Sequence, residues 1–372
     1  MRRADVAIVG AGMAGASLAA EVAAHGSVLL IEAENRPGYH STGRSAAFWS
    51  ECYGGPLVQP LTTASGRFLA APPADFADEP FLSPRGAVHL ADADGEGALD
   101  ALRREFEGSG VPLRRLDRAG IEAVVPGLRP GWDRGLEEPS CADIDVAGLH
   151  AAYLRRARRL GAELVTDARL LAADRTGAGW RLETAAGTFE AAVLVDAAGA
   201  WADEVARLAG AAPIGVQPYR RTIVQLLVAP PAPAGMPLVI DALGRFYFKP
   251  EAGGRLWLSP HDETACDPCD SAAEEIDIAV AIDRMERAVD WKVERVEHSW
   301  AGLRSFAPDR LPVYGFAPDA PGFFWFAGQG GFGIQTAPAA ARLAAALLLG
   351  RTPDPLVAGI DPGPYSAGRF RN

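Results

Sequence analysis

The pattern of apolar positions opens with two short runs on either side of a glycine-rich turn. Val6–Val9 is continuously apolar, as expected of a strand buried on both faces, and it ends at Gly10. Residues 16–24 then predict a helix, and Val28–Ile31 predicts a second buried strand that ends at Glu32. A strand, glycine turn, helix, strand and acidic residue within about 30 residues are typical of a dinucleotide-binding βαβ unit.

Each glycine of the first turn has a physical reason in such a unit. Gly10 allows the tight turn, Gly12 lets the backbone approach a pyrophosphate, and Gly15 lets the helix pack closely on the strand. The helix N-terminus would offer free N–H groups to the phosphates, and the Glu32 carboxylate could accept hydrogen bonds from ribose hydroxyls. An ordinary glycine-rich βα turn is the alternative explanation.

A second glycine turn lies near the end of the sequence. Residues 322–327 predict a buried strand, residues 334–349 predict a helix, and the turn between them, 328–333, is rich in glycine. A helix N-terminus stabilises negative charge, which a reduced flavin carries near N1 and O2. Two such turns therefore favour FAD over NAD, because NAD has no second ring system that needs a helix end.

Between the two glycine turns, the hydrophobic pattern changes from that of buried strands and helices to that of an antiparallel sheet. A short strand is expected over 188–191, and a separate buried strand over 192–195 leads to Gly199. A polar loop after Glu32 is expected to run into a helix from Ser45. Short strands that alternate with turns predict an antiparallel sheet from residue 217 onwards, at 221–227, 237–240, 245–249 and 255–259. The sequence thus predicts an α/β protein with a discontinuous Rossmann-like domain and a mostly antiparallel α+β domain.

Composition narrows the function classes. The formal net charge of −11 argues against a nucleic-acid-binding protein, whose binding surface is basic. No apolar run approaches the ~20 residues that span a bilayer, and the regularly spaced glycines after Arg3 fit a βα turn better than a signal peptide. The four cysteines are too few for a disulfide framework in a chain of this length. We therefore expect a cytoplasmic protein with no membrane span.

Five segments occur in the same order as in one known family. Together they resemble the FAD-dependent D-amino-acid oxidase superfamily, which includes glycine and sarcosine oxidases and D-amino-acid dehydrogenases. Within it, the chain is most similar to the bacterial dehydrogenases of D-arginine. The segments are residues 5–32, 38–47, 193–201, 298–306 and 328–336.

The resemblance implies two domains and a set of cofactor contacts. An FAD-binding domain would comprise residues 1–80, 144–216 and 308–372, and a substrate-binding domain residues 81–143 and 217–307. We expect non-covalent FAD, because no cysteine follows Cys269 toward the C-terminus, where some relatives attach the flavin. The residues implied to contact FAD are Gly10, Gly12, Gly15, Glu32, Ser41, Thr42, Arg44, Ser45, Ala46, Ala168, Gly199, Gly330, Gly331, Gly333, Ile334 and Gln335.

An amino-acid carboxylate calls for an arginine, whose planar guanidinium can bind it through two hydrogen bonds. The family pattern assigns Arg221 and Arg304 to that role and matches Tyr53 and Tyr247 to its pocket tyrosines. For either arginine taken alone, a surface salt bridge would be the ordinary explanation. The resemblance also implies a substrate pocket that includes Phe48, Ala87, Gly331 and Gln335.

The reaction implied by the resemblance is oxidative deamination of a D-amino acid. A hydride passes from Cα to flavin N5, and the imino acid then hydrolyses to a 2-oxo acid and ammonia. Because the flavin carries this chemistry, we expect neither a catalytic triad nor a metal. A dehydrogenase is favoured, but the residues do not distinguish a quinone or dye-like electron acceptor from O2.

Two positions depart from the D-arginine enzymes. Where those enzymes have a histidine and a glutamate, this chain has Phe48 and Ala87. Loss of the carboxylate would leave a guanidinium side chain poorly paired, at a cost of roughly 1.5–3 kcal/mol. We therefore expect a less cationic and more apolar substrate than arginine. Glu51, and His89 on the same predicted strand face as Ala87, could restore polarity.

Other readings of the sequence stay open. The same fold could oxidise a 2-hydroxy acid, whose carboxylate needs the same arginine, or a secondary amine of the glycine or sarcosine type. A flavin-binding subunit without catalysis is a third possibility, although the retained tyrosines and arginines argue against it.

The four residues Cys266-Asp-Pro-Cys269 have the spacing of a redox pair or of half a zinc site. No second such pair and no cluster of histidines completes a metal site, and the thioredoxin-like βαβ context is missing. Two free thiols in a loop are therefore expected.

Overall fold

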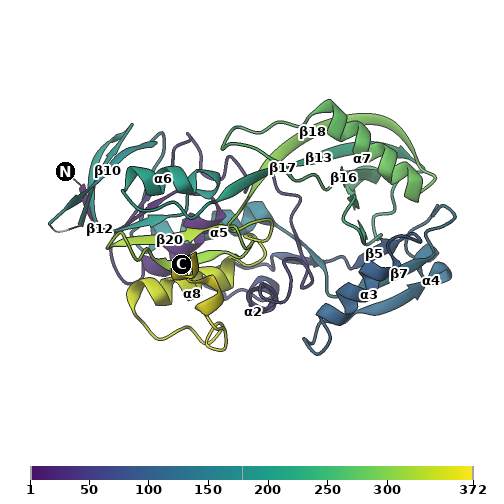
Figure 1. Ribbon diagram of the computed structural model, residues 1–372, viewed down its shortest axis with the longest axis horizontal. Coiled ribbons are helices and arrows are strands. Elements are labelled where there is room, and N and C mark those ends of the chain that lie inside the picture. Colours follow the sequence, from purple (N-terminus) through teal and green to yellow (C-terminus); the bar gives the residue numbers. More distant parts are fainter. Residues whose placement is uncertain (1, 178, 371–372) are drawn as a thin grey trace.

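The computed structural model describes residues 2–177 and 179–370, and it places the first apolar run inside a largely parallel sheet (Figure 1). The strands of this first sheet are β1 (Arg2–Val9), β2 (Val28–Ile31), β9 (Glu163–Val165), β10 (Leu170–Thr176), β11 (Gly179–Thr184), β12 (Gly187–Asp196), β19 (Val313–Phe316) and β20 (Phe323–Ala327). Their order is β10-β11-β12-β1-β2-β9, and β20 pairs with β12 and β19. β1, β2, β9, β12 and β20 run parallel, whereas β10, β11 and β19 are antiparallel to their neighbours.

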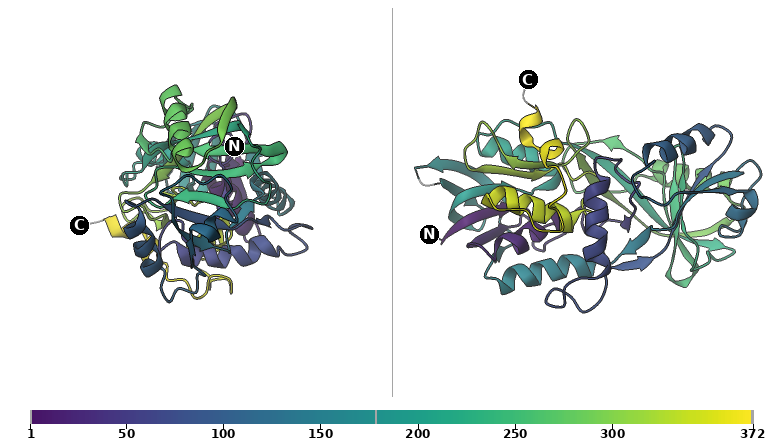
Figure 2. Two further views of the ribbon diagram at one scale, coloured as in Figure 1. Left: turned by 90° about the vertical axis from the view of Figure 1, so that its right-hand side faces the viewer. Right: turned by 90° about the horizontal axis from the view of Figure 1, so that it is seen from below.

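The two faces of the first sheet bury alternate residues of β1. Val6 and Ile8 belong to a core that they share with the helices on one face, and Ala7 and Val9 belong to the core on the other face. The helices of this half are α1 (Met13–Val22), α5 (Val146–Arg159), α6 (Ala202–Leu208) and α8 (Ala337–Leu349). α1, α5 and α8 pack on the first face, as the view from below shows for α5 and α8, and α6 packs on the second (Figure 2).

A second sheet lies toward the opposite end of the molecule and is mostly antiparallel (Figure 1). Its order is β17-β13-β16-β15-β14-β5-β7-β6, with β18 along β13, and only β14 and β5 pair in parallel among the described residues. The strands are β5 (Ala87–Ala91), β6 (Arg114–Asp117), β7 (Arg134–Glu138), β13 (Gln217–Ala229), β14 (Leu238–Asp241), β15 (Tyr247–Glu251), β16 (Arg255–Ser259), β17 (Thr264–Ala265) and β18 (Lys292–Phe306). α7 (Glu275–Ala288) packs on one face, and α3 (Glu96–Glu105) and α4 (Arg118–Glu122) lie beside β5, β6 and β7.

A small third sheet joins chain segments that lead from one large sheet to the other. It has the order β3-β8-β4, with β3 (Phe48–Trp49), β4 (Leu82–Pro84) and β8 (Ala142–Ile144). α2 (Gln59–Ala70) follows β3, and the Trp49 indole donates a hydrogen bond to the carbonyl of Thr62 in that helix at 2.9 Å. Both large sheets thus draw on separated stretches of the chain, and the domain boundaries given above stay a prediction.

Two of the predicted elements are wrong in type or extent. No helix starts at Ser45, because Phe48 and Trp49 pair instead with Asp143 and Ala142 in β8. Partners about a hundred residues away override a local preference in this segment. The runs 188–191 and 192–195 form the single strand β12, because its first half pairs with β11 and its last residues pair with β20.

Asp196 ends β12 with a fully buried carboxyl group. One of its oxygens accepts a hydrogen bond from the backbone N–H of Ala198 at 3.0 Å, and the other has no partner among the described residues. Burial raises the pKa of Asp196 well above its ordinary value. The folded state therefore favours the neutral acid, and ionisation of Asp196 at neutral pH destabilises the folded protein.

We expect Asp196→Asn to raise the melting temperature at pH 8 by about 2 °C or more. A folded-state pKa above the unfolded value of 3.8 gives stability that is complete below pH 3.8 and is lost as pH rises through the folded-state pKa. The gain should therefore shrink as the pH is lowered toward 4. Thermal unfolding followed by circular dichroism from pH 4 to 8 measures it. A melting temperature lowered equally at every pH would contradict the prediction.

Candidate functional site

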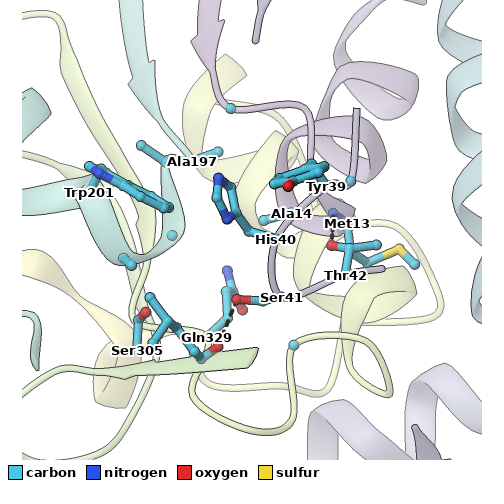
Figure 3. A pocket seen from close by; sticks show the side chains of 18 of the residues that line it. Met13, Ala14, Tyr39, His40, Ser41, Thr42, Ala197, Trp201, Ser305 and Gln329 are labelled. Atoms are coloured by element: carbon cyan, nitrogen blue, oxygen red, sulfur yellow. Dashed lines mark hydrogen bonds between the residues drawn. The ribbon is translucent and has the colours of Figure 1, made fainter. Parts of the chain in front are cut away.

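A long cavity lies between the first sheet and one face of the second (Figure 3). Two glycine turns, one loop and one sheet face form most of its wall. It is lined by residues of the segments 9–14, 31–34, 38–46, 168–170, 197–201, 302–305 and 329–334, together with Glu204, Val205, Leu208, Arg221 and Ile223. The two glycine turns predicted from the sequence therefore meet at one site.

The first turn is held by backbone contacts that leave no room for side chains. Gly10 has a φ of 99°, and a Cβ there would lie 2.4 Å from the carbonyl oxygen of Ala197. A Cβ on Gly15 would lie 1.8 Å from the carbonyl oxygen of Gly10. Gly12 precedes α1 and lines the cavity, where its missing side chain leaves the helix N-terminus accessible. Gly10 and Gly15 thus have the turn and packing geometry that the glycine spacing predicted, and the contact of Gly12 with a pyrophosphate stays a prediction.

Thr42 lies at this turn, at the N-terminus of α1. Its hydroxyl oxygen accepts a hydrogen bond from the backbone N–H of Met13 at 2.9 Å, in the first turn of α1 (Figure 3). A Cβ on Gly12 would lie 3.2 Å from the same oxygen. The loop 38–46 therefore packs against the first glycine turn.

Glu32 lines the cavity, and its side chain also holds the first turn in place. Its carboxylate accepts hydrogen bonds from the N–H of Ala11 at 2.8 Å and of Glu34 at 3.0 Å. The carbonyl of Glu32 accepts from the N–H of Ala168 at 2.8 Å, and both residues line the cavity. This arrangement brings together the residues expected at the adenosine end.

Aromatic rings that the sequence did not single out line the middle of the cavity. His40 lies between Tyr39 and Trp201, with ring centroids 5.0 Å and 4.6 Å away (Figure 3). His40 also contacts the Glu34 carboxylate at 2.9 Å. The sequence did not predict that His40 and Trp201 lie close together, because 160 residues separate them.

The remaining loop residues divide between the cavity and its wall. The Ser41 hydroxyl donates to the carbonyl of Leu303 at 2.7 Å, which ties the loop to β18. The Arg44 guanidinium binds the carbonyl of Ser271 at 2.7 Å and the Asp270 carboxylate, so its positive charge is paired within the protein. Ser45, Ala46 and Gly199 also line the cavity.

The second glycine turn faces the arginine-bearing sheet. Gly330 has a φ of 56°, and its N–H donates to the carbonyl of Ser305 at 2.9 Å. Gly330, Gly331, Gly333 and Ile334 line the cavity. α8 begins at Ala337 rather than at Ile334, so the turn is three residues longer than the sequence predicted.

Gln335 lies behind this wall. Its side-chain amide donates to the carbonyls of Ser50 and Tyr53 and to the Thr62 hydroxyl, and its oxygen accepts from the N–H of Ser50. The side chain is buried with 1% exposure. Gln335 therefore holds the segment that carries Tyr53, and its amide is occupied by these contacts.

Arg221 and Arg304 lie on the same face of the second sheet. Arg304 is opposite Tyr219 in the β13–β18 register, and Arg221 is two residues beyond Tyr219 on β13. Both arginines line the cavity, and each has one buried guanidinium nitrogen without a hydrogen-bond partner in the described part of the chain. Arg221 is 3% exposed, and its other nitrogens bind the carbonyl of Asp262 at 2.6 Å and the Glu263 carboxylate at 3.2 Å.

Tyr53 and Tyr247 gather around Phe48. The Phe48 ring centroid is 5.9 Å from those of both tyrosines. Burial raises the pKa of Tyr53 and raises that of Tyr247 to about 12, so both phenols keep their protons at neutral pH. No hydrogen bond of ordinary geometry joins the Tyr247 hydroxyl to another group within residues 2–177 and 179–370, although the Ser259 hydroxyl lies close enough to interact with its oxygen. The phenol O–H of Tyr247 is therefore available as a donor.

Gly331 brings Tyr53 and Arg304 together. A Cβ on Gly331 would lie 1.8 Å from the Tyr53 hydroxyl oxygen and 3.1 Å from Arg304 Cδ. The glycine thus admits the phenol close to the second turn and beside the arginine. Unsatisfied donors from Arg221, Arg304 and Tyr247 near this point are the chemical complement of a carboxylate.

Ala87 is fully buried, and the nearest buried carboxylate has other partners. Ala87 pairs with Glu138 across β5 and β7, and both residues have 0% exposure. Glu138 accepts hydrogen bonds from the Ser50 hydroxyl at 2.8 Å and the Glu51 N–H at 2.7 Å. His89 Nε2 lies 3.7 Å from Glu138, beyond hydrogen-bond distance. The Glu138 carboxylate is thus directed to the Ser50 side chain and the Glu51 backbone.

The described residues contain no group of three or more His, Cys, Asp or Glu side chains that could hold a metal ion. Across the same described ranges, no helix is both long and apolar enough to cross a membrane.

Comparison with known proteins agrees with this geometry. Residues 5–347 match the family model described as DAO, FAD dependent oxidoreductase. A glycine oxidase from Pseudomonas aeruginosa is 29% identical over 98% of this chain and 99% of its own length. A D-amino acid dehydrogenase from Agrobacterium fabrum is 25% identical over 69% of this chain and 62% of its own length. The crystal structure of glycine oxidase from Geobacillus kaustophilus has a TM-score of 0.86 at 24% identity, over 100% of both chains, and this likeness confirms the predicted fold class.

We expect Gly15→Ala to weaken FAD binding at least about tenfold, since overpacking costs of order 1–3 kcal/mol. The added methyl group would lie 1.8 Å from the Gly10 carbonyl oxygen and displace the turn. Titration of the apoprotein with FAD, followed by flavin fluorescence, measures the affinity, and circular dichroism checks the fold.

Gly97→Ala is the matched control, because a Cβ at this helical glycine has nothing within 4 Å. It should bind FAD as the unmodified protein does. Equal affinities for the folded Gly15→Ala variant and the control would contradict the role given to the first turn.

Proposed function

This chain belongs to the DAO family of FAD-dependent oxidoreductases, and from that premise we propose that it deaminates a D-amino acid by oxidising its Cα–N bond. FAD is the cofactor, as the sequence predicted. The cavity fits it: the first turn has no side chains where a pyrophosphate would lie, Glu32 stands at the ribose end, and the second turn leaves space beside the sheet.

The observation that carries the proposal is the set of unpaired donors on one sheet face. Arg221 and Arg304 each keep a buried nitrogen free of partners in the described residues, and the phenol O–H of Tyr247 is available as a donor there. A buried donor without a partner is costly, so the arrangement favours an anionic ligand. A substrate carboxylate bound there would place Cα beside the second glycine turn.

The residues of this chain would bind and orient the substrate. Bound FAD supplies the acceptor for the hydride that leaves Cα. Arg304 and Arg221 fix the carboxylate, and the neutral phenols of Tyr53 and Tyr247 donate hydrogen bonds without adding charge. The α-amine must be neutral when the hydride leaves, so its proton is lost beforehand.

The predicted side-chain end of the pocket, whose Phe48 and Ala87 are not among the residues that line the cavity, supports an uncharged substrate. Phe48 presents an aromatic ring between Tyr53 and Tyr247, and Ala87 offers no carboxylate. Glu51, which the sequence left as a possible source of polarity, accepts a hydrogen bond from the Thr63 hydroxyl at 2.5 Å. We therefore favour an apolar D-amino acid over D-arginine.

A glycine- or sarcosine-type oxidase is a second candidate. The glycine oxidase of Pseudomonas aeruginosa matches 98% of this chain, which supports a small amine substrate as well as a larger D-amino acid. Both candidates use the same arginines, and they differ in the size of the amine substrate. The preference for a dehydrogenase rests on the resemblance to the D-arginine enzymes.

A panel of substrates added to the yellow protein under nitrogen tests the proposal. Apolar D-amino acids such as D-methionine and D-leucine should bleach the flavin faster than D-arginine or D-lysine, and admission of air should restore the colour slowly. If glycine or sarcosine bleaches the flavin fastest, the second candidate is correct. If lactate bleaches it fastest, the protein is a hydroxy-acid enzyme. No bleaching by any compound would indicate a subunit without catalysis.

Arg304→Lys should lower kcat/KM about 10- to 100-fold, mainly through KM, because a lost hydrogen bond to a charged group is worth about 1.5–3 kcal/mol. Lysine keeps the charge but loses the planar pair of donors. Steady-state kinetics with the best substrate of the panel measure the effect.

Arg295→Lys is the matched control, since Arg295 lies on the same strand with 64% side-chain exposure. Its kinetics should equal those of the unmodified enzyme. An unchanged KM for Arg304→Lys would remove Arg304 from carboxylate binding.

A further inference from the structure

Arg221 is held by two acceptors in the turn 260–263, which follows β16. Its Nε donates to the carbonyl of Asp262 at 2.6 Å, and its Nη2 donates to the Glu263 carboxylate at 3.2 Å. Nη1 is therefore the one guanidinium nitrogen of Arg221 without a partner in the described part of the chain. The orientation of that free nitrogen is set by residues 262 and 263.

The turn is fixed to the strand that carries Arg221. The Asp262 carboxylate accepts hydrogen bonds from the N–H of Thr222 at 2.7 Å and from its hydroxyl at 3.0 Å. His261 has a φ of 56°, a left-handed conformation that is uncommon for residues other than glycine. Its N–H donates to the Ser259 hydroxyl at 3.1 Å. Such a conformation persists only where the surrounding contacts impose it, so the turn has a fixed position beside Arg221.

Glu263 is itself held from the other side by Arg310. Nη2 of Arg310 donates to both oxygens of the Glu263 carboxylate, at 2.9 Å and 3.0 Å. The Arg310 guanidinium also lies over the Phe306 ring, with its carbon Cζ 3.8 Å from the ring centroid. The Glu263 side chain is 37% exposed, whereas that of Arg221 is 4% exposed. Glu263 therefore joins the buried arginine of the cavity to an arginine at the surface, and both contacts restrict its rotation.

We propose that Glu263 is a positioning residue for the substrate carboxylate, because its hydrogen bond fixes the orientation of the Arg221 guanidinium. Glu263 does not touch the substrate in this role and acts through Arg221. The effect on an amino-acid substrate rests on the proposed function, whereas the effect on other small carboxylates does not.

The Glu263 carboxylate has two effects of opposite sign on an anion bound at Arg221. Its negative charge repels the anion, which lowers the affinity by about threefold at most from a partly exposed position. Its hydrogen bond keeps Nη1 of Arg221 in place before the anion arrives, which raises the affinity. Replacement by glutamine removes the charge and keeps an acceptor oxygen, whereas replacement by alanine removes both. The ratio of the affinities of the two variants therefore isolates the hydrogen bond.

The first test measures the Kd of benzoate, a carboxylate that needs no turnover, from the flavin spectrum of the FAD-loaded enzyme. The Kd of Glu263→Ala should exceed that of Glu263→Gln by about fivefold or more, because a hydrogen bond to a charged group is lost. Glu263→Gln should bind benzoate as tightly as the unmodified enzyme, or up to about threefold more tightly. Equal Kd values for the two variants would overturn the proposal.

The second test uses steady-state kinetics with the best substrate of the panel. KM should again be highest for Glu263→Ala, while kcat changes by less than about twofold in both variants, because Glu263 does not touch the reacting atoms. A merely structural role would lower the melting temperature of both variants and leave the ratio of their KM values near one. That result would contradict the role given to Glu263.

Glu96→Ala is the matched control for loss of an exposed carboxylate. Glu96 also pairs with an arginine, Arg134 at 2.6 Å, its side chain is 47% exposed, and it does not line the cavity. Its benzoate Kd and its KM should equal those of the unmodified enzyme. A shift as large as that of Glu263→Ala would indicate a general effect of lost surface charge and remove the link to Arg221.

The two proposals fail in distinguishable ways. If no amino acid bleaches the flavin but the benzoate Kd still differs between Glu263→Ala and Glu263→Gln, the proposed function is wrong and the role of Glu263 holds. If an amino acid is oxidised but the two variants have equal Kd and KM values, the role of Glu263 is wrong. If neither an amino acid nor benzoate changes the flavin spectrum, Arg221 binds no carboxylate and both proposals are wrong.

Discussion

The contact between backbone segments at the first glycine turn is the constraint on which the rest of the structure depends. Gly10 lies against the carbonyl of Ala197, and Gly15 lies against Gly10, so β1, α1 and the end of β12 meet with no side chain between them. This contact opens the cavity at the helix N-terminus. It also fixes the position of residues 197–201, which follow β12 and line the cavity. The long cavity therefore follows from the close packing of three elements at one point.

The parts of this fold that could be predicted from the sequence are those whose requirements are local. The glycines of both turns and the apolar runs before them are read within a few residues, because a tight turn and a buried strand restrict their own positions. The pairing of Phe48 with Asp143 and the continuity of β12 depend on partners far along the chain. Local preference does not report such partners, and there the sequence predicted a helix and two strands.

The site shows the same division. Arg221 and Arg304 were expected from a family pattern, and alternation along β13 and β18 explains why they share a face. Nothing near Gln335 or Glu138 in sequence indicated that both bind the segment 50–53. Gln335 binds the backbone of Ser50 and Tyr53, whereas Glu138 binds Ser50 and Glu51. Their partners lie 87 to 285 residues away, so only the folded chain shows this support.

The close approach of Tyr53 to Gly331 also limits how this protein can evolve. The phenol occupies the volume that any side chain at position 331 would need. Replacement of Gly331 therefore requires the phenol to move away or Tyr53 to become smaller, whereas a smaller residue at position 53 needs no change at position 331. Substitutions at the two positions are thus expected to be epistatic.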